Sequence, residues 1–415
     1  MGKSLERFLR FTVFTLLLVA PTQWSLEVGS KLHLTLADIL LALGALLFLS
    51  GGWRREMGQR LILPSPFAIF FVFWGAVSIT VAADRPAAVK DFFQWTLYFV
   101  VGWMLIGHII SETRTRRTAL LAATVSAAIV LFLALIQVFN SQLADINVGG
   151  TFGNRNVLAG FAALALPFAL AMVLDSDSPA IKAAAAIAAL LGLTVLLSGA
   201  AALAIAIAFI AMAAFRGRGA LAAALLLIFI FMTLFHPRLP RRAGLRENWP
   251  DAEEWHDPWS DSIALHEETL ELARRYPEWE VAWRLASDHP WRGVGAGNYQ
   301  QAISEGSYRN IATRPGEPEP DTQNLYLVLA VSVGFPALLA FLAMLVEGML
   351  SALKAMSGNT RLRRVESSLA LGTFGSLLAF AITAIWHPLL VRGIGIPLVA
   401  VLALAGQLNQ LAQRD

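Results

Sequence analysis

The chain has no cysteine among its 415 residues. That absence excludes a disulfide framework, a thiolate nucleophile and any metal site built on cysteine. Charged residues are also scarce: they make up 15% of the chain, whereas a soluble domain carries about 25%. The formal net charge is only +3, and the basic residues lie in short clusters between apolar runs. Such clusters indicate membrane topology rather than a nucleic-acid surface, so we expect no nucleic-acid partner.

Several signatures of other classes are missing. There is no Gly-x-Ser-x-Gly, which leaves a serine hydrolase without support. No spacing of His, Asp and Glu suggests a metal site; Trp255-His-Asp257 alone is too little. An apolar run follows Lys3, Arg7 and Arg10, but no small-x-small cleavage site follows it. We therefore expect an uncleaved first helix rather than a signal peptide.

Apolar residues dominate what is present. They make up 57% of the chain, the mean hydropathy is +0.61, and apolar runs long enough to cross a bilayer recur from end to end. The predicted fold class is an all-α polytopic membrane protein with about twelve transmembrane helices. The expected spans are 8–25, 34–50, 62–83, 89–110, 118–139, 156–174, 180–198, 200–215, 219–235, 324–347, 366–386 and 389–410.

The basic clusters predict the orientation. With twelve spans they all fall on one side of the membrane: Lys3, Arg7 and Arg10; Arg54, Arg55 and Arg60; Arg114, Arg116 and Arg117; Lys182; Arg216 and Arg218; Lys354, Arg361, Arg363 and Arg364. The positive-inside rule makes that side cytoplasmic. Both termini are then cytoplasmic, and the long polar loop between helices nine and ten lies outside.

That topology divides the chain into transmembrane helices one to nine (1–235), a periplasmic loop domain (236–323) and helices ten to twelve (324–415). The polar stretch from His236 to Asn324 holds six of the twelve tryptophans and four of the seven histidines. Chemistry in a mostly apolar protein is expected where water, charge and aromatic surface meet. Within the loop, 260–275 has helical spacing, and a second short helix is expected to end near Asp288.

The run Gly293-Val-Gly-Ala-Gly297 has the composition of a phosphate-binding loop. Its context differs, because no βαβ unit surrounds it and its third glycine comes one residue early. Glycines that let the backbone turn tightly beside the membrane are the favoured interpretation. No nucleotide or other cofactor is predicted.

Three segments carry further patterns, in this order along the chain: Gly150-Thr-Phe-Gly-Asn-Arg-Asn-Val-Leu-Ala-Gly160, Asp288-His-Pro-Trp-Arg-Gly-Val-Gly-Ala-Gly-Asn-Tyr299 and Asn324-Leu-Tyr-Leu-Val-Leu-Ala-Val-Ser-Val-Gly-Phe-Pro336. Together they resemble motifs of the O-antigen ligase and O-antigen polymerase superfamily. The single dominant late loop agrees with that resemblance, which covers about 148–347 with motifs.

The resemblance implies an inverting, metal-independent membrane glycosyltransferase of lipopolysaccharide or cell-surface polysaccharide synthesis. It would move a glycan from undecaprenyl pyrophosphate to a sugar hydroxyl, such as one on lipid A-core, at the bacterial inner membrane. A ligase is favoured over a polymerase because only one external loop is long. Two alternatives stay open: an O-antigen or exopolysaccharide polymerase, and a non-catalytic relative that binds lipid-linked glycan.

The sequence departs from the family pattern at two positions. The family usually has His immediately before Asn324, where this chain has Gln323, and it often has an Arg where this chain has Ala201. Glutamine cannot accept and carry a proton as imidazole does. Gln323 is therefore expected to orient the acceptor hydroxyl, while His387 or His289 serves as base.

Arginines supply the expected contacts to the donor pyrophosphate, because each offers a permanently charged, fork-shaped set of donors. The candidates are Arg155, Arg292, Arg284 and Arg392. Further substrate-binding candidates lie in the family-like segments: Asn154, Asn156, Asn324 and Tyr326. Gln323 is expected to face one cavity together with Arg155 and Arg292.

Overall fold

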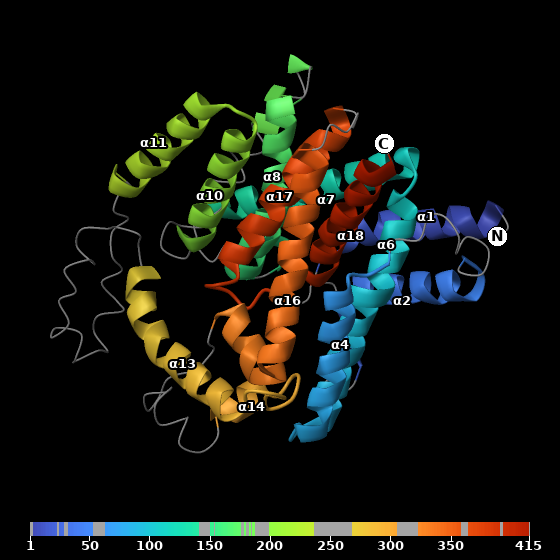
Figure 1. Ribbon diagram of the computed structural model, residues 1–415, viewed down its shortest axis with the longest axis vertical. Helices are drawn as coiled ribbons and strands as arrows, with labels where there is room; N and C mark the ends of the chain where they lie inside the picture. The colour runs from blue at the N-terminus through green and yellow to red at the C-terminus, as the bar shows by residue number, and fades with distance from the viewer. Residues whose placement is uncertain are drawn as a thin grey trace.

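The computed structural model describes residues 3–22, 25–28, 32–52, 63–140, 150–152, 154–175, 178–179, 182–183, 185–186, 199–235, 268–304, 323–357, 364–390 and 393–414. The described elements are overwhelmingly helical (Figure 1). The α-helices are α1 (Lys3–Val19), α2 (Leu36–Leu47), α4 (Pro66–Ser78), α5 (Arg85–Thr96), α6 (Trp103–Ile110), α7 (Thr113–Asn140), α8 (Arg155–Asp175), α10 (Gly199–Phe215), α11 (Gly219–Phe235), α13 (Glu268–Asp288), α14 (Tyr299–Ser304), α16 (Leu325–Ser357), α17 (Arg364–Thr383) and α18 (Gly395–Arg414).

Short π- and 3-10-helical pieces extend several of these helices. They are η1 (Phe48–Gly52), η2 (Ile79–Val81), η3 (Leu97–Gly102) and η4 (Gly150–Phe152). The fold departs from the all-α prediction in one place: β1 (Ser25–Val28) and β2 (Leu32–Thr35) form an antiparallel pair in which Ser25 lies opposite Thr35. The predicted first helix, 8–25, is wrong at its end, because α1 stops at Val19, just before Pro21. Proline disfavours helical backbone at the residue before it.

Six described helices are long and apolar enough to cross a membrane: Arg85–Ile110, Thr113–Gln137, Asn156–Asp175, Leu325–Met356, Val365–Thr383 and Gly395–Gln413. Shorter apolar helices cover Leu36–Ser50, Pro66–Val81 and Ala201–Phe215. This is the composition of a polytopic membrane protein. The count of twelve spans stays a prediction, since the expected span 180–198 lies mostly outside the described residues.

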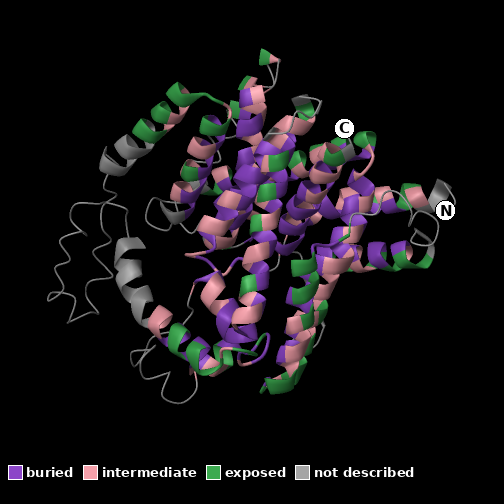
Figure 2. Cartoon of the chain, viewed as in Figure 1, coloured by how far each residue is buried: buried purple, intermediate pink, exposed green. Residues whose placement is uncertain are grey.

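The core is built around α16, which packs against α4, α17 and α18, while α17 also packs against α8 and α10. Figure 2 shows buried residues concentrated along these central helices and exposed residues on α11 and α4. Phe71, Phe99 and Phe341 join α4, η3 and α16 with ring centroids 5.5–6.4 Å apart. The packing of these apolar helices therefore fixes the positions of the polar segments that connect them.

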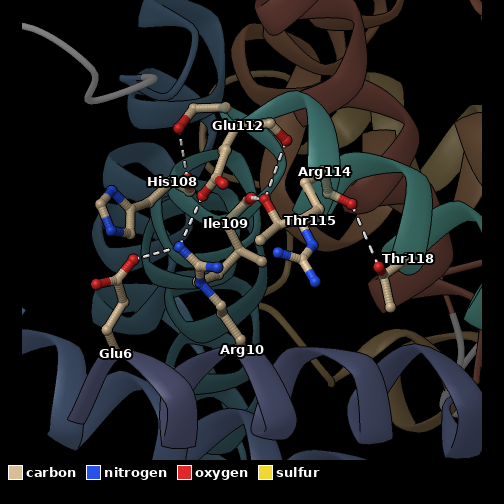
Figure 3. A network of polar contacts seen from close by, with 9 residues as sticks. Glu6, Arg10, His108, Ile109, Glu112, Arg114, Thr115 and Thr118 are labelled. Atoms are coloured by element: carbon tan, nitrogen blue, oxygen red, sulfur yellow. Dashed lines mark hydrogen bonds and ion pairs between the residues drawn. The ribbon is translucent and has the colours of Figure 1, made fainter. Parts of the chain in front are cut away.

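Three of the basic clusters pair with acidic side chains of other helices. Arg10 of α1 bonds Glu6 and also reaches Glu112, between α6 and α7, at 2.7 Å (Figure 3). One turn further on, Arg116 bonds Glu366 of α17 at 2.9 Å. Arg216 contacts Asp175 of α8 and donates to the carbonyl oxygen of Ser367 at 2.9 Å. These contacts join α1, α7, α8 and α17, together with the turns after α6 and α10, along one polar belt.

The Arg116–Glu366 pair predicts a stability effect, because its side chains are only 3% and 12% exposed. Removing one partner of a buried ion pair costs about 3–5 kcal/mol, so Glu366→Gln should lower the melting temperature of the protein in detergent micelles markedly. The matched control is Glu280→Gln, which breaks the exposed pair of Glu280 with Arg284 and should cost less than about 1 kcal/mol. Equal melting temperatures for the two variants would contradict this ranking.

Candidate functional site

Helix α16 is broken at Gly334, which has φ 81° and ψ 169°. The break separates a first part, 325–333, from a long second part, 335–357, and Figure 1 shows α16 bending sharply near α14. A break leaves backbone N–H and C=O groups without helical partners. Inside or beside a membrane such groups must find partners within the protein.

The partners come from the loop segment 289–298, here called the docking turn. Three backbone hydrogen bonds join it to the break: Val294 N–H to Val331 O at 2.8 Å, Gly295 N–H to Ser332 O at 2.9 Å, and Phe335 N–H to Pro290 O at 2.8 Å. The docking turn thus supplies two donors and one acceptor that the broken helix lacks. These three hydrogen bonds hold the docking turn firmly against α16.

The glycines of the docking turn are required by close packing. Gly293, with φ 62°, lies so near the carbonyl of Val331 that a side chain would collide with it. A Cβ on Gly295, with φ 105°, would lie 2.5 Å from the Cβ of Ala82. Because L-residues rarely adopt such φ values, glycine is needed for both conformation and space. The structure therefore supports the tight-turn interpretation of this run.

The docking turn also binds the link between α4 and α5. The side chain of Asn298 is 2% exposed; it accepts from the Asp84 N–H at 2.6 Å and donates to the Asp84 and Ala296 carbonyls at 3.1 and 2.8 Å. The N–H of Ala296 donates to Ser78 Oγ at 3.2 Å. Trp74 of α4 donates from Nε1 to the Trp291 carbonyl at 2.7 Å. The docking turn is therefore fixed on two sides.

A small apolar core supports it from a third side. It joins α13, α14 and the first part of α16 through Val281, Ala282, Leu285, Ala286, Tyr299, Ile303, Ala330 and Val331. The sequence predicted two helices in this region; the structure has the single helix α13, which does end at Asp288 as expected. The described part of the loop is thus a compact helical cap on the α16 break.

A pocket of about 500 Å³ lies at this junction. It is lined by Val81 and Ala83 from the α4–α5 side and by side chains of the cap that include Asp288, His289 and Arg292. Arg292 is exposed, and its Nη1 lies 3.4 Å from Thr80 Oγ1. A cation and an imidazole therefore share one surface pocket, where they can contact an anionic or hydroxylated ligand.

A second group of predicted residues gathers at the start of α16. Asn324 caps this helix, since its Oδ1 accepts from the Tyr326 and Leu327 N–H groups at 3.0 and 3.1 Å. The Tyr326 hydroxyl donates to the Ala381 carbonyl of α17 at 2.6 Å. His387, in the link from α17 to α18, is 1% exposed. Asn324 and Tyr326 therefore have structural roles in joining α16 to α17.

The start of α8 packs against the link between α17 and α18. Asn154 Oδ1 accepts from the N–H of Asn156 at 2.8 Å, which caps the helix that Arg155 begins. A Cβ on Gly393 would lie 2.7 Å from the ring of Phe152, and one on Gly160 would lie 2.6 Å from Leu389. The family-like segment 150–160 and the α17–α18 link are therefore packed together. The side chain of Arg155 lies outside the described residues.

The structure thus separates the predicted site residues into two groups. His289 and Arg292 share the pocket, whereas Gln323 precedes the first part of α16, whose nine residues span about 13 Å. Gln323 is not among the residues that line the pocket. Arg284 lies on the exposed face of α13 and pairs with Glu280. Arg392 lies outside the described residues; α18 begins only at Gly395, not at 389 as expected.

Two positions that depart from the family pattern have clear surroundings. Ala201 is fully buried in α10 among apolar side chains of α8 and α17. Gln323 has φ 41° and is the one non-glycine with positive φ in the described part of the chain. Such a backbone is uncommon and is often found at functional sites. No signal in the sequence could have revealed this conformation.

The described residues contain no group of three or more His, Asp or Glu that could hold a metal ion.

Part of the chain is similar to a described protein family. Residues 183–342 match a family model described as O-antigen ligase. The matched range contains α10, α11, α13, the docking turn, α14 and α16 through its break. No curated protein matches the chain.

The break at Gly334 predicts that Gly334→Ala, which adds a single methyl group, destabilises the protein. Alanine at φ 81° and ψ 169°, a backbone region essentially restricted to glycine, costs about 1–3 kcal/mol, and its Cβ would also collide with the Trp291 carbonyl. Gly334→Ala should therefore release the cap, lower the melting temperature and speed protease cleavage within 268–304. Gly219→Ala, where nothing lies within 4 Å of the added Cβ, should leave both measurements unchanged. An unaltered Gly334→Ala protein would show that the docking is not needed.

Proposed function

We propose that this chain, which carries an O-antigen ligase family domain over residues 183–342, is a membrane glycosyltransferase that moves a lipid-linked glycan to a sugar hydroxyl. One observation carries the proposal: the docking turn, which brings Arg292 and His289 to the pocket and is hydrogen-bonded to the α16 break, lies within the matched range. The family match supports the class of reaction, and the pocket supplies residue types that this reaction needs.

The chemistry is a displacement at the anomeric carbon. The acceptor oxygen forms a bond to that carbon while the bond to the pyrophosphate oxygen breaks, and the acceptor proton passes to a base. A single displacement of this kind inverts the anomeric configuration. The leaving pyrophosphate gains charge, which Arg292 can stabilise through permanently charged donors. Arg155 begins α8 beside the α17–α18 link, and it is proposed to bind a different part of the donor from Arg292.

The base is proposed to be a histidine. His289 lines the pocket. His387 is buried and comes three residues after Ala384, whose carbonyl accepts the Leu325 N–H at the start of α16 at 2.9 Å. Gln323 can orient the acceptor hydroxyl but cannot remove its proton. Arginine charge takes the role that a metal ion would have in stabilising the leaving group, so the proposed mechanism is metal-independent.

The donor is proposed to be a glycan on undecaprenyl pyrophosphate, and the acceptor lipid A-core, at the bacterial inner membrane. The cap faces the periplasm and both termini the cytoplasm, as the basic clusters predict. The polar belt that contains Arg10, Arg116 and Arg216 supports this orientation, since it draws on three of those clusters. Transfer to a second donor glycan instead of lipid A-core would identify a polymerase.

The first functional prediction concerns Arg292. A charge-assisted contact contributes about 1.5–3 kcal/mol, so Arg292→Ala should weaken binding of a lipid pyrophosphate about tenfold or more. Arg292→Lys should restore only part of the affinity, because lysine lacks the bidentate fork. Arg114→Ala, an exposed cation at the start of α7, is the control and should bind normally. Calorimetry on detergent-solubilised protein measures all three, and normal binding by Arg292→Ala removes this residue from the site.

The second functional prediction concerns Gln323. Gln323→His should raise transfer from a synthetic lipid-pyrophosphate glycan by about 100-fold, the lower end of what general-base catalysis supplies. Histidine is among the residues that tolerate positive φ, so the substitution suits the backbone. Gln323→Asn also suits this φ but adds no base, and it should leave the rate low. Fast transfer by the unaltered protein that survives Gln323→Ala and is abolished by His387→Ala would place the base at His387.

A further inference from the structure

Trp291 is the most exposed large apolar side chain of the cap, with 70% of its surface accessible. It is also one of the residues that line the pocket. A tryptophan presents a large flat apolar face together with one polar N–H. Exposure of that face at the edge of a pocket is the arrangement expected when a ligand, rather than the protein, covers it.

The backbone that carries Trp291 is held firmly. Its carbonyl accepts the Nε1–H of Trp74 at 2.7 Å and lies against Gly334, where no side chain would fit. The neighbouring Pro290 carbonyl accepts the N–H of Phe335 at 2.8 Å. The base of the indole is therefore fixed before any ligand arrives. Pre-organisation of this kind lowers the entropy that binding must overcome.

Polar side chains surround the same pocket. Asp288, Arg292 and Gln301 line it together with Trp291. They offer carboxylate, guanidinium and amide groups, which can accept from and donate to hydroxyls. A pyranose ring has hydroxyls around its rim and a face of C–H groups. An exposed indole bordered by planar polar side chains complements both of those surfaces, and about 500 Å³ is the size of an ordinary small-ligand site.

Trp283 provides the contrast within the same cap. It is 56% exposed, but its ring packs edge-on against Phe335 with centroids 5.7 Å apart, and it does not line the pocket. Its surroundings fit the aromatic belt at a membrane–water interface. Trp283 and Trp291 therefore have different surroundings, although the sequence alone does not distinguish them.

We propose that the pocket is a saccharide subsite in which one pyranose ring of a glycan substrate packs against the indole of Trp291 while Asp288 and Gln301 bind its hydroxyls, and Arg292 at its edge is left to the pyrophosphate. The inference rests on the proposed function for its choice of ligand. It adds a recognition element for the sugar itself, separate from the pyrophosphate and from the lipid. The ring could belong to the donor glycan or to the acceptor.

The test is calorimetry on the full-length protein in lipid nanodiscs with soluble, lipid-free probes. One probe is the core oligosaccharide released by mild acid from lipopolysaccharide of the source cells, and another is the repeat-unit oligosaccharide without its pyrophosphate. Inorganic pyrophosphate is the third. Trp291→Ala should weaken oligosaccharide binding by roughly tenfold or more, whereas Trp291→Phe, which keeps an aromatic face, should stay within roughly threefold. Trp283→Ala is the matched control and should bind as the unaltered protein does.

Each outcome decides the proposal. Binding of the core oligosaccharide alone assigns the subsite to the acceptor, and binding of the repeat unit alone assigns it to the donor. Equal effects of Trp291→Ala and Trp283→Ala overturn it, as does a Trp291→Leu protein that binds as well as Trp291→Phe. Binding of pyrophosphate without either oligosaccharide shows an anion site and also overturns it.

The measurement does not depend on transfer. Oligosaccharide binding that requires Trp291 in a protein without transferase activity would retain the subsite and refute the proposed enzyme. Transfer activity with no oligosaccharide binding at Trp291 would do the reverse. The subsite and the enzymatic function can therefore fail separately.

Discussion

The unsatisfied backbone at Gly334 is the constraint on which the rest of the structure depends. A helix that breaks beside apolar neighbours must recover its lost hydrogen bonds within the protein. Here the docking turn supplies them through Pro290, Val294 and Gly295. The cap is thereby fixed to the most central helix of the bundle.

Several features of the chain follow from that attachment. Glycines at 293, 295 and 334 are needed because two backbones approach within contact distance there. Asn298 uses its amide to hold the α4–α5 link, which closes the junction from a second direction. The pocket is the space left between these fixed pieces, so its lining residues occupy positions set by backbone hydrogen bonds. A rigid frame of this kind suits a site that must orient a glycan.

Two regions of the described structure hold arginines in different surroundings. One is the polar belt, in which Arg10, Arg116 and Arg216 are paired with acidic groups and hold helices together. The other is the cap, where Arg292 lies in an open pocket beside the Thr80 hydroxyl of η2. Paired cations stabilise the fold, whereas an exposed cation in a pocket can bind a ligand. That difference is why the proposed chemistry is assigned to the cap.

The sequence by itself determined the membrane class, most helix positions and the end of α13 at Asp288, and it drew attention to the segment 288–299. These features follow from apolar run length, Pro and Gly, which influence the backbone of nearby residues. It also singled out His289 and Arg292 as candidates, and the structure places both of them in one pocket. Only the tertiary structure decided that α16 is broken, that Asn324 and Tyr326 serve the packing of α16, and that Gln323 does not line the pocket that holds Arg292. Those outcomes depend on contacts between segments far apart in the chain, such as Pro290 with Phe335 and Tyr326 with Ala381. Local periodicity carries no information about such contacts.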